Sequence, residues 1–351
     1  MPRPRKPSRS RSYTALDLFS GCGGLTTGLK RAGFRVLGAV ENDPVSARTY
    51  RSNHPAVHIW QEDIRDVRAK TLLQDLRLKR GELDLLAACP PCQAFSTMRT
   101  LNRGRRIIAR KEKDLLTEVM RFVRVLLPRT VMVENVPGLA CDRRWLSLVA
   151  KLRKLGFFSQ YRVLNAADFG VPQRRKRLIL LASRLGPVNF ALPEPERATV
   201  KQTIGSLPKA GRSRDSLHNI PERRNPGIKT LISLIPKDGG SRGDLEDSLQ
   251  LPCHHECNGF RDVYGRMKWD DVAPTITSGC TNPSKGRFLH PQENRSITLR
   301  EAALLQSFPK SYRFHVRDGK SAIAAMIGNA LPPEFISRHA RELRKVTRDC
   351  S

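Results

Sequence analysis

The chain of 351 residues carries 63 lysines and arginines against 33 aspartates and glutamates, a formal net charge of +30. Such an excess favours a polyanionic partner such as a nucleic acid, because clustered cations release counterions when they meet phosphates. The chain has no run of about 18 apolar residues, and its eight cysteines show no framework spacing. The sequence therefore argues against a membrane-spanning protein and against a secreted protein held together by disulfides.

The N-terminal half opens like a nucleotide-binding α/β fold. Residues 1–12 are basic and rich in proline and serine, which predicts a disordered tail. Residues 15–19 indicate a buried strand, residues 20–24 a tight glycine turn, and residues 25–32 a helix. The dinucleotide fingerprint is absent, because it requires glycine where Thr26 stands. The loop therefore need not hold a pyrophosphate.

The next two predicted strands each lead to an acidic side chain. Residues 35–40 lead to Glu41, and residues 57–60 are followed by Asp63 and Ile64. Glu41 stands at about the distance at which such folds hold ribose hydroxyls, and an ordinary surface or capping carboxylate is the alternative. The pair of Asp63 and Ile64 would suit an adenine amino group beside an apolar wall.

A candidate nucleophile follows the next apolar run. After a helical pattern in residues 67–78, residues 83–88 indicate a buried strand that ends in the sequence PPCQ at residues 90–93. The two prolines force the chain out of the sheet and present Cys92 at the carboxyl end of the strand, where open α/β sheets keep their chemistry. A packed core cysteine, or a redox or metal pair with Cys89, remains an alternative.

The segment after this cysteine is polar and rich in arginine. Residues 97–113 show almost no apolar periodicity. Such a loop is suited to closing over a phosphate, and a solvated connector is the alternative.

A second half of the sheet is predicted from residue 115 onward. Helices are expected at residues 115–127 and 145–155, strands at residues 130–133, 161–164 and 178–182, and a turn at residues 169–172. Glu134 again places an acid at the end of a strand. In residues 173–177 alternate cations would point to one side of an extended segment, as a clamp on a phosphate or base requires.

The composition changes after residue 183. Residues from about 190 to 300 are rich in proline, glycine, serine and arginine with weak periodicity, which predicts a second domain dominated by loops. The Cys253–Cys257 cluster has no second pair at the usual distance, so no metal is predicted. The last predicted elements are a helix at residues 298–308, capped by Thr298 with Glu301, a turn at residues 327–333, and a helix at residues 335–346 that returns to the first domain.

Taken together and in this order, these stretches resemble the motif set of the DNA (cytosine-5) methyltransferases. The resemblance covers residues 16 to about 341. The motifs that carry it are residues 17–24, Glu41, Asp63 with Ile64, residues 90–93, residues 134–136, residues 173–177, residues 300–309 and residues 328–333.

The resemblance implies an α/β fold: a Rossmann-like S-adenosylmethionine-dependent methyltransferase core with a small loop-rich target-recognition domain. We expect the catalytic domain at residues 13–189, the recognition domain at residues 190–310, and a segment at residues 311–351 that returns to the catalytic domain. The implied reaction is sequence-specific methylation of carbon 5 of cytosine in duplex DNA, on a base flipped out of the helix.

The family also implies residue roles. Cys92 would add as a thiolate to carbon 6 of the base, Glu134 would supply a proton or strong hydrogen bond at N3, and Arg177 with Arg175 would hold the ring. Expected cofactor contacts are Phe19, Gly21, Gly23, Glu41, Asp63, Ile64, Pro91 and Asn329. Expected DNA contacts are Gln93, Ser96, Arg99, Arg261, Arg266 and Lys268.

Two other functions fit similar motifs: methylation of tRNA by the RNA branch of the family, and DNA binding by a non-catalytic member. The long recognition segment favours DNA, and an intact Cys92 favours catalysis. We expect a cytoplasmic, nucleoid-associated monomer of the type II modification class. It would be either an orphan or the partner of a restriction endonuclease encoded nearby.

Overall fold

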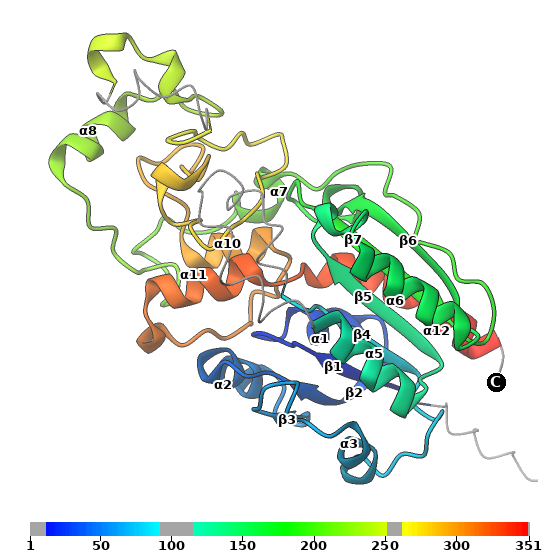
Figure 1. Cartoon of the computed structure of the whole chain (residues 1–351). Coiled ribbons are helices and arrows are strands. Elements are labelled where there is room, and N and C mark those ends of the chain that lie inside the picture. The colour runs from blue at the N-terminus through cyan, green and yellow to red at the C-terminus, as the bar shows by residue number, and fades with distance from the viewer. Residues whose placement is uncertain (1–11, 92–114, 251–261, 350–351) are drawn as a thin grey trace, which may run out of the picture.

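The computed structural model describes residues 12–91, 115–250 and 262–349. Its centre is a sheet of seven strands in the order β3-β2-β1-β4-β5-β7-β6 (Figure 1). The strands are β1 (Tyr13–Leu18), β2 (Phe34–Val40), β3 (His58–Trp60), β4 (Leu85–Ala88), β5 (Thr130–Asn135), β6 (Phe158–Asn165) and β7 (Lys176–Ser183). β1 to β5 are mutually parallel, whereas β7 pairs antiparallel with both β5 and β6.

Helices cover both faces of this sheet. One core contains side chains of α3 (Ala69–Asp75), α5 (Leu115–Leu126) and α6 (Arg143–Lys154). The other contains side chains of α1 (Gly24–Arg31), α2 (Pro44–Asn53) and α12 (Pro333–Asp349). Because both faces are covered, the central strands are buried along their length: all four residues of β4 and all six of β5 are buried.

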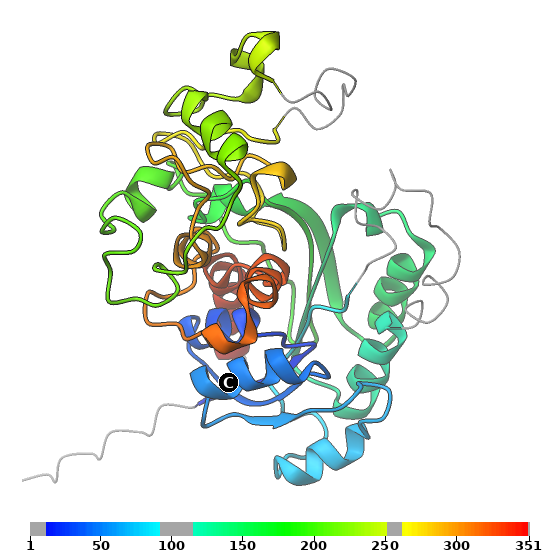
Figure 2. The same cartoon turned by 90° about the vertical axis from the view of Figure 1, so that its left-hand side faces the viewer.

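The rest of the described chain forms a second lobe with little regular structure. It holds α7 (Val200–Ile204), α8 (Pro226–Leu234), α10 (Leu299–Leu305) and α11 (Lys320–Asn329), linked by loops and single turns. The view in Figure 2 shows α8 and the turns after it farthest from the sheet. Residues 190–310 are called the recognition segment below.

The cores divide this lobe differently from the expected boundary at residue 310. α7, α10 and α11 share one hydrophobic cluster, which also receives Cys22 from the glycine loop. α12 instead packs on the sheet. By packing, the return to the first domain therefore begins after α11, near residue 330.

Two local predictions have different outcomes. The cap of α10 is confirmed: Thr298 Oγ1 accepts a bond from the main-chain N–H of Glu301, whose side chain accepts from the N–H of Thr298. The turn at residues 327–333 is partly wrong, because α11 continues to Asn329 before the chain turns. Among the described residues, no helix is long and apolar enough to cross a membrane.

Candidate active site

The predicted site residues of the catalytic lobe collect at one edge of the sheet, where the five parallel strands end. Glu41 directly follows β2, and Glu134 stands near the end of β5. β7 runs in the opposite direction, so Arg177 at its start reaches the same edge. The topology thus brings together residues that are far apart in the sequence.

The glycine loop after β1 has a left-handed backbone. Phe19, Gly21 and Gly23 have φ angles of 62°, 54° and 100°, and the N–H of Gly23 bonds to the carbonyl of Ser20 at 2.9 Å. A methyl group added at Gly21 would meet no atom within 4 Å. The loop therefore borders open space at Gly21, whereas a methyl group at Gly23 would meet His54 and Tyr312 at 2.6 Å.

Thr26, which stands where the dinucleotide fingerprint has glycine, has a structural partner. Its hydroxyl donates to Oδ2 of the buried Asp17 at 2.6 Å and lies 2.7 Å from the hydroxyl of Tyr50. This network anchors α1 to β1 beneath the loop, and sequence reasoning missed it.

Glu41 joins the glycine loop to the end of β2. One carboxylate oxygen accepts from the N–H of Gly21 at 2.7 Å, and the other accepts from the N–H of Asp43 at 2.8 Å. Burial raises the pKa of Glu41. Each oxygen retains a further lone pair, so the carboxylate can also accept from hydroxyl groups of a ligand.

Asp63 and Ile64 follow β3 as predicted. Ile64 is buried, whereas Asp63 forms an ion pair with Arg65 at 2.5 Å. Hydrogen bonding from this guanidinium lowers the pKa of Asp63 to about 2. A ligand amino group at Asp63 must share the carboxylate with Arg65 or displace it.

The chain that follows β4 is hydrogen-bonded to the end of β5. The side-chain amide of Asn135 donates to the carbonyl of Pro90 at 3.0 Å, and its oxygen accepts from the N–H of Val136 at 2.8 Å. Pro91 is exposed at this edge, as is Asn329 at the end of α11. Cys92, Gln93, Ser96, Arg99 and Arg261 lie outside the described residues.

Glu134 is the centre of the described site. It is 4% exposed, and its Oε1 lies 2.9 Å from Nε of Arg177 in an ion pair. The Cys89 thiol donates to Oε2 at 2.7 Å. Burial raises the pKa of this thiol well above its usual range, and the Glu134 carboxylate raises it further. Cys89 is therefore a neutral hydrogen-bond donor and unsuited to act as a thiolate.

Arg175 lies on the same side of its segment as Arg177 but has other partners. Its terminal nitrogens donate to the carbonyls of Ile276 at 2.9 Å and Gly328 at 3.0 Å. Burial lowers its pKa, and the nearby charge of Arg177 acts in the same direction. The expected alternation of cations is present, but Arg175 links the two lobes through hydrogen bonds. Of the two arginines, only Arg177 bonds to Glu134.

Comparison with known proteins agrees with this geometry. A family model described as C-5 cytosine-specific DNA methylase matches residues 13–345. The chain belongs to this family. It is 36% identical over 332 residues to the type II methylase M.HgiDII of Herpetosiphon aurantiacus, covering 90% of this chain and 91% of that protein. It is 33% identical to the type II methyltransferase M1.HphI of Haemophilus parahaemolyticus, covering 95% of this chain and 87% of that one.

Solved structures support the same assignment. A putative DNA modification methyltransferase encoded within an Escherichia coli prophage superposes with a TM-score of 0.69 at 25% identity, covering 96% of this chain and all of that one. The predicted fold class and the predicted activity of a DNA (cytosine-5)-methyltransferase are confirmed.

In the recognition segment of this methyltransferase, one predicted DNA contact is wrong. Arg266 is 0% exposed, and its guanidinium is fully engaged inside the segment. It donates to the carbonyls of Ile232, Ile235, His290 and Glu293 and to the side chain of Asn294. Arg266 therefore holds the end of α8 in place, whereas Lys268 is exposed and free to meet a phosphate.

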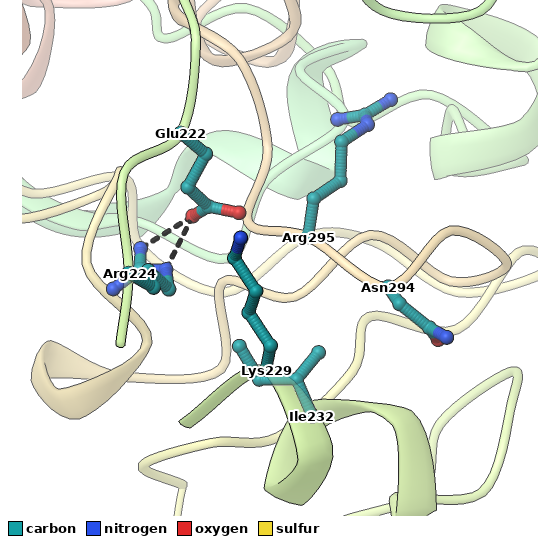
Figure 3. A pocket seen from close by; sticks show the side chains of 6 residues that line it. All are labelled: Glu222, Arg224, Lys229, Ile232, Asn294 and Arg295. Atoms are coloured by element: carbon teal, nitrogen blue, oxygen red, sulfur yellow. Dashed lines mark hydrogen bonds and ion pairs between the residues drawn. The ribbon is translucent and has the colours of Figure 1, made fainter. Parts of the chain in front are cut away.

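The methylase also has a hollow of about 390 Å³ in the recognition segment (Figure 3). It is lined by Glu222, Arg224, Lys229, Ile232, Asn294 and Arg295. Nε of Arg224 donates to Glu222 at 2.7 Å, and the Lys229 side chain extends toward the same carboxylate. Sequence reasoning did not identify these residues as a group.

Proposed function

We propose that this enzyme acts on duplex DNA with Cys92 as the nucleophile. Glu134 donates a proton to N3 of the cytosine, and Arg177 is the cationic partner of Glu134. The observation that carries the proposal is the Glu134 and Arg177 ion pair at 2.9 Å, at the same edge where β4 leads toward Cys92. We further propose that it acts as a monomer in the cytoplasm, on the nucleoid. It would be the modification enzyme of a type II system or an orphan, as its relatives suggest.

The chemistry explains why these side chains are needed together. Carbon 5 of cytosine is a poor nucleophile until a bond forms between the Cys92 sulfur and carbon 6, which turns the ring into an enamine. The charge that this addition moves onto the ring is met by a proton from Glu134 at N3. After carbon 5 is methylated, it gives its proton to a water molecule, and the electrons of that C–H bond form the double bond between carbons 5 and 6 as the bond from sulfur to carbon 6 breaks. N3 then returns its proton to Glu134, and the Cys92 thiolate is restored.

Arg177 fits this cycle electrostatically. Its guanidinium beside Glu134 stabilises the carboxylate that remains after the proton has passed to N3, and its remaining N–H groups can bind the base oxygen or a neighbouring phosphate. Because carbon 6 is inaccessible in a stacked duplex, the target must leave the helix to reach this edge.

The residues at the edge of the sheet suit S-adenosylmethionine. When bound, this cofactor supplies an electrophilic methyl group on a sulfonium and brings no phosphate. The glycine loop lacks the dinucleotide fingerprint and borders open space. Phe19, Gly21 and Gly23 would form one wall, Glu41 would accept from the ribose hydroxyls, and Asp63 with Ile64 would meet the adenine. Pro91 and Asn329, both exposed at this edge, would complete the pocket.

The test is methyl transfer to mixed-sequence duplex DNA, followed by bisulfite sequencing. We expect conversion-resistant cytosines within one short word for the wild-type protein. Cys92→Ala should abolish transfer yet bind DNA, whereas Cys141→Ala, which removes an exposed cysteine, should act as wild type. Transfer to tRNA in preference to DNA would contradict the proposed substrate, and wild-type turnover by Cys92→Ala would contradict the proposed nucleophile.

A further inference from the structure

Cys89 contacts the reactive carboxylate although nothing in the proposed cycle requires a second cysteine. Its thiol lies 2.7 Å from Oε2 of Glu134, on the side of the carboxylate opposite to Arg177. Three strands converge here, because Cys89 follows β4, Glu134 belongs to β5 and Arg177 to β7. We propose that Cys89 is a positioning residue, whose thiol fixes the orientation of the Glu134 carboxylate.

The argument for orientation begins with the lone pairs of the carboxylate. Each oxygen can accept two hydrogen bonds. Arg177 occupies one position on Oε1, and the Cys89 thiol occupies one on Oε2. Rotation of the carboxylate would break both bonds. The remaining lone pairs of the Glu134 carboxylate therefore point in fixed directions before a base arrives. Transfer of a proton to N3 requires such a fixed direction.

The thiol can hold the carboxylate in this orientation because it keeps its proton. Burial and the neighbouring Glu134 carboxylate raise the pKa of the Cys89 thiol, so it remains a hydrogen-bond donor. A hydrogen bond donated to a carboxylate is charge-assisted and therefore stronger than one between neutral groups.

This inference rests on the proposed role of Glu134 and is tested by the steady-state kinetics of two Cys89 variants. Cys89→Ala should lower kcat about tenfold, the worth of one hydrogen bond. It should leave KM for S-adenosylmethionine unchanged. Cys89→Ser keeps a donor and should recover kcat.

Two results would overturn the inference. One is a Cys89→Ala enzyme with wild-type kcat. The other is a Cys89→Ser enzyme that is impaired as much as Cys89→Ala, since this would mean that the sulfur acts only by filling space. Cys141→Ala again serves as the control for loss of a cysteine.

A readout independent of turnover separates this inference from the proposed function. The infrared S–H stretching band of Cys89 can be isolated as the difference between wild-type and Cys89→Ser spectra. In the wild type it should lie at lower frequency than in Glu134→Gln, whose neutral amide is a weaker acceptor. Identical frequencies would overturn the contact. A wild-type protein with the shifted band but without methyl transfer would contradict the proposed function alone.

Discussion

Asp17 lies beneath the glycine loop with no exposed surface, and among the described residues only its Oδ2 has a hydrogen-bond partner, the Thr26 hydroxyl. Burial raises the pKa of Asp17 to about 7, and the charge of Glu41 contributes in the same direction. Such a carboxyl resists ionisation because the interior solvates its charge poorly. The same network that anchors α1 therefore makes the fold sensitive to pH.

The expected consequence is a loss of stability as the pH rises. A carboxyl whose folded pKa exceeds its unfolded value of about 3.8 binds its proton more tightly in the native state. Its contribution is thus complete below pH 4 and is lost as the pH rises toward 7. The side chain of Asp17→Asn cannot ionise. Relative to the wild type, the free energy of unfolding of this variant should therefore increase by on the order of 3 kcal/mol between pH 4 and pH 7.

Denaturant unfolding of both proteins at several pH values between 4 and 8 measures this difference. The comparison cancels the other titrating groups, which both proteins share. A difference that stays constant with pH would show that Asp17 is ionised in the folded protein.

Arg177 offers a second prediction for a single side chain. Arg177→Ala removes the cation that is paired with Glu134, and we expect kcat to fall by roughly 100-fold or more. Arg177→Lys should recover only part of this loss, because an ammonium cannot reproduce the geometry of the Nε contact. Lys176→Ala, on the exposed side of β7, is the matched control and should keep wild-type kcat in the methylation assay.

Motif order was sufficient to select Glu134 and Arg177 as candidate site residues, but it did not predict the ion pair between them. Sequence reasoning could not predict the Cys89 contact, because 45 residues separate it from Glu134 and only the sheet order brings β4 beside β5. It also misassigned Arg266, whose sequence neighbours do not reveal that carbonyls from two other segments surround it.

Among the elements, α1 and α12 approach each other closely through a glycine. A methyl group added at Gly28 would lie 2.6 Å from the carbonyl oxygen of Pro333 and 2.6 Å from Cβ of Ile336, both in α12. The clash could not be relieved by a small side-chain movement, because one contact is to backbone and the other is to the Cβ of a branched side chain. This contact fastens the C-terminal helix beside the glycine loop.

Gly28→Ala should therefore destabilise the protein by about 2 kcal/mol, since α12 must move away from α1. Gly227→Ala in α8 is the matched control, because its nearest neighbour, Oδ1 of Asn225, would be 3.7 Å from the new methyl group. That substitution should stabilise by about 0.5 kcal/mol through the better helix propensity of alanine. Thermal unfolding of the two variants tests the contrast, and equal effects would contradict it.

The elements differ in how well the sequence predicts them. The strands and α1, α5, α6, α10 and α12 follow from apolar runs and helical spacing. α2, α7, α8 and α11 were not predicted. α2 has a weakly apolar pattern and α8 lies in a segment rich in proline and glycine, although both begin with a signal that could have found them. Asp43 and Asn225 are capping residues, and each is followed by proline at the first helical position. The end of α11 depends on packing against residues 277 and 278, which no local pattern encodes.

For the whole molecule, the net charge of +30 gives a prediction about DNA affinity. Neutralised phosphates release counterions, so log Kd should rise linearly with log salt. For about six contacts the slope should be about 5.

Lys268→Ala should lower this slope by about 1 if its exposed ammonium meets a phosphate. The control is Lys154→Ala at the end of α6, which precedes β6 at the sheet edge opposite the site. It should leave the slope unchanged. A flat salt response of the wild type would mean that its basic excess lies away from the DNA, whereas equal slopes for all three proteins would exclude only Lys268.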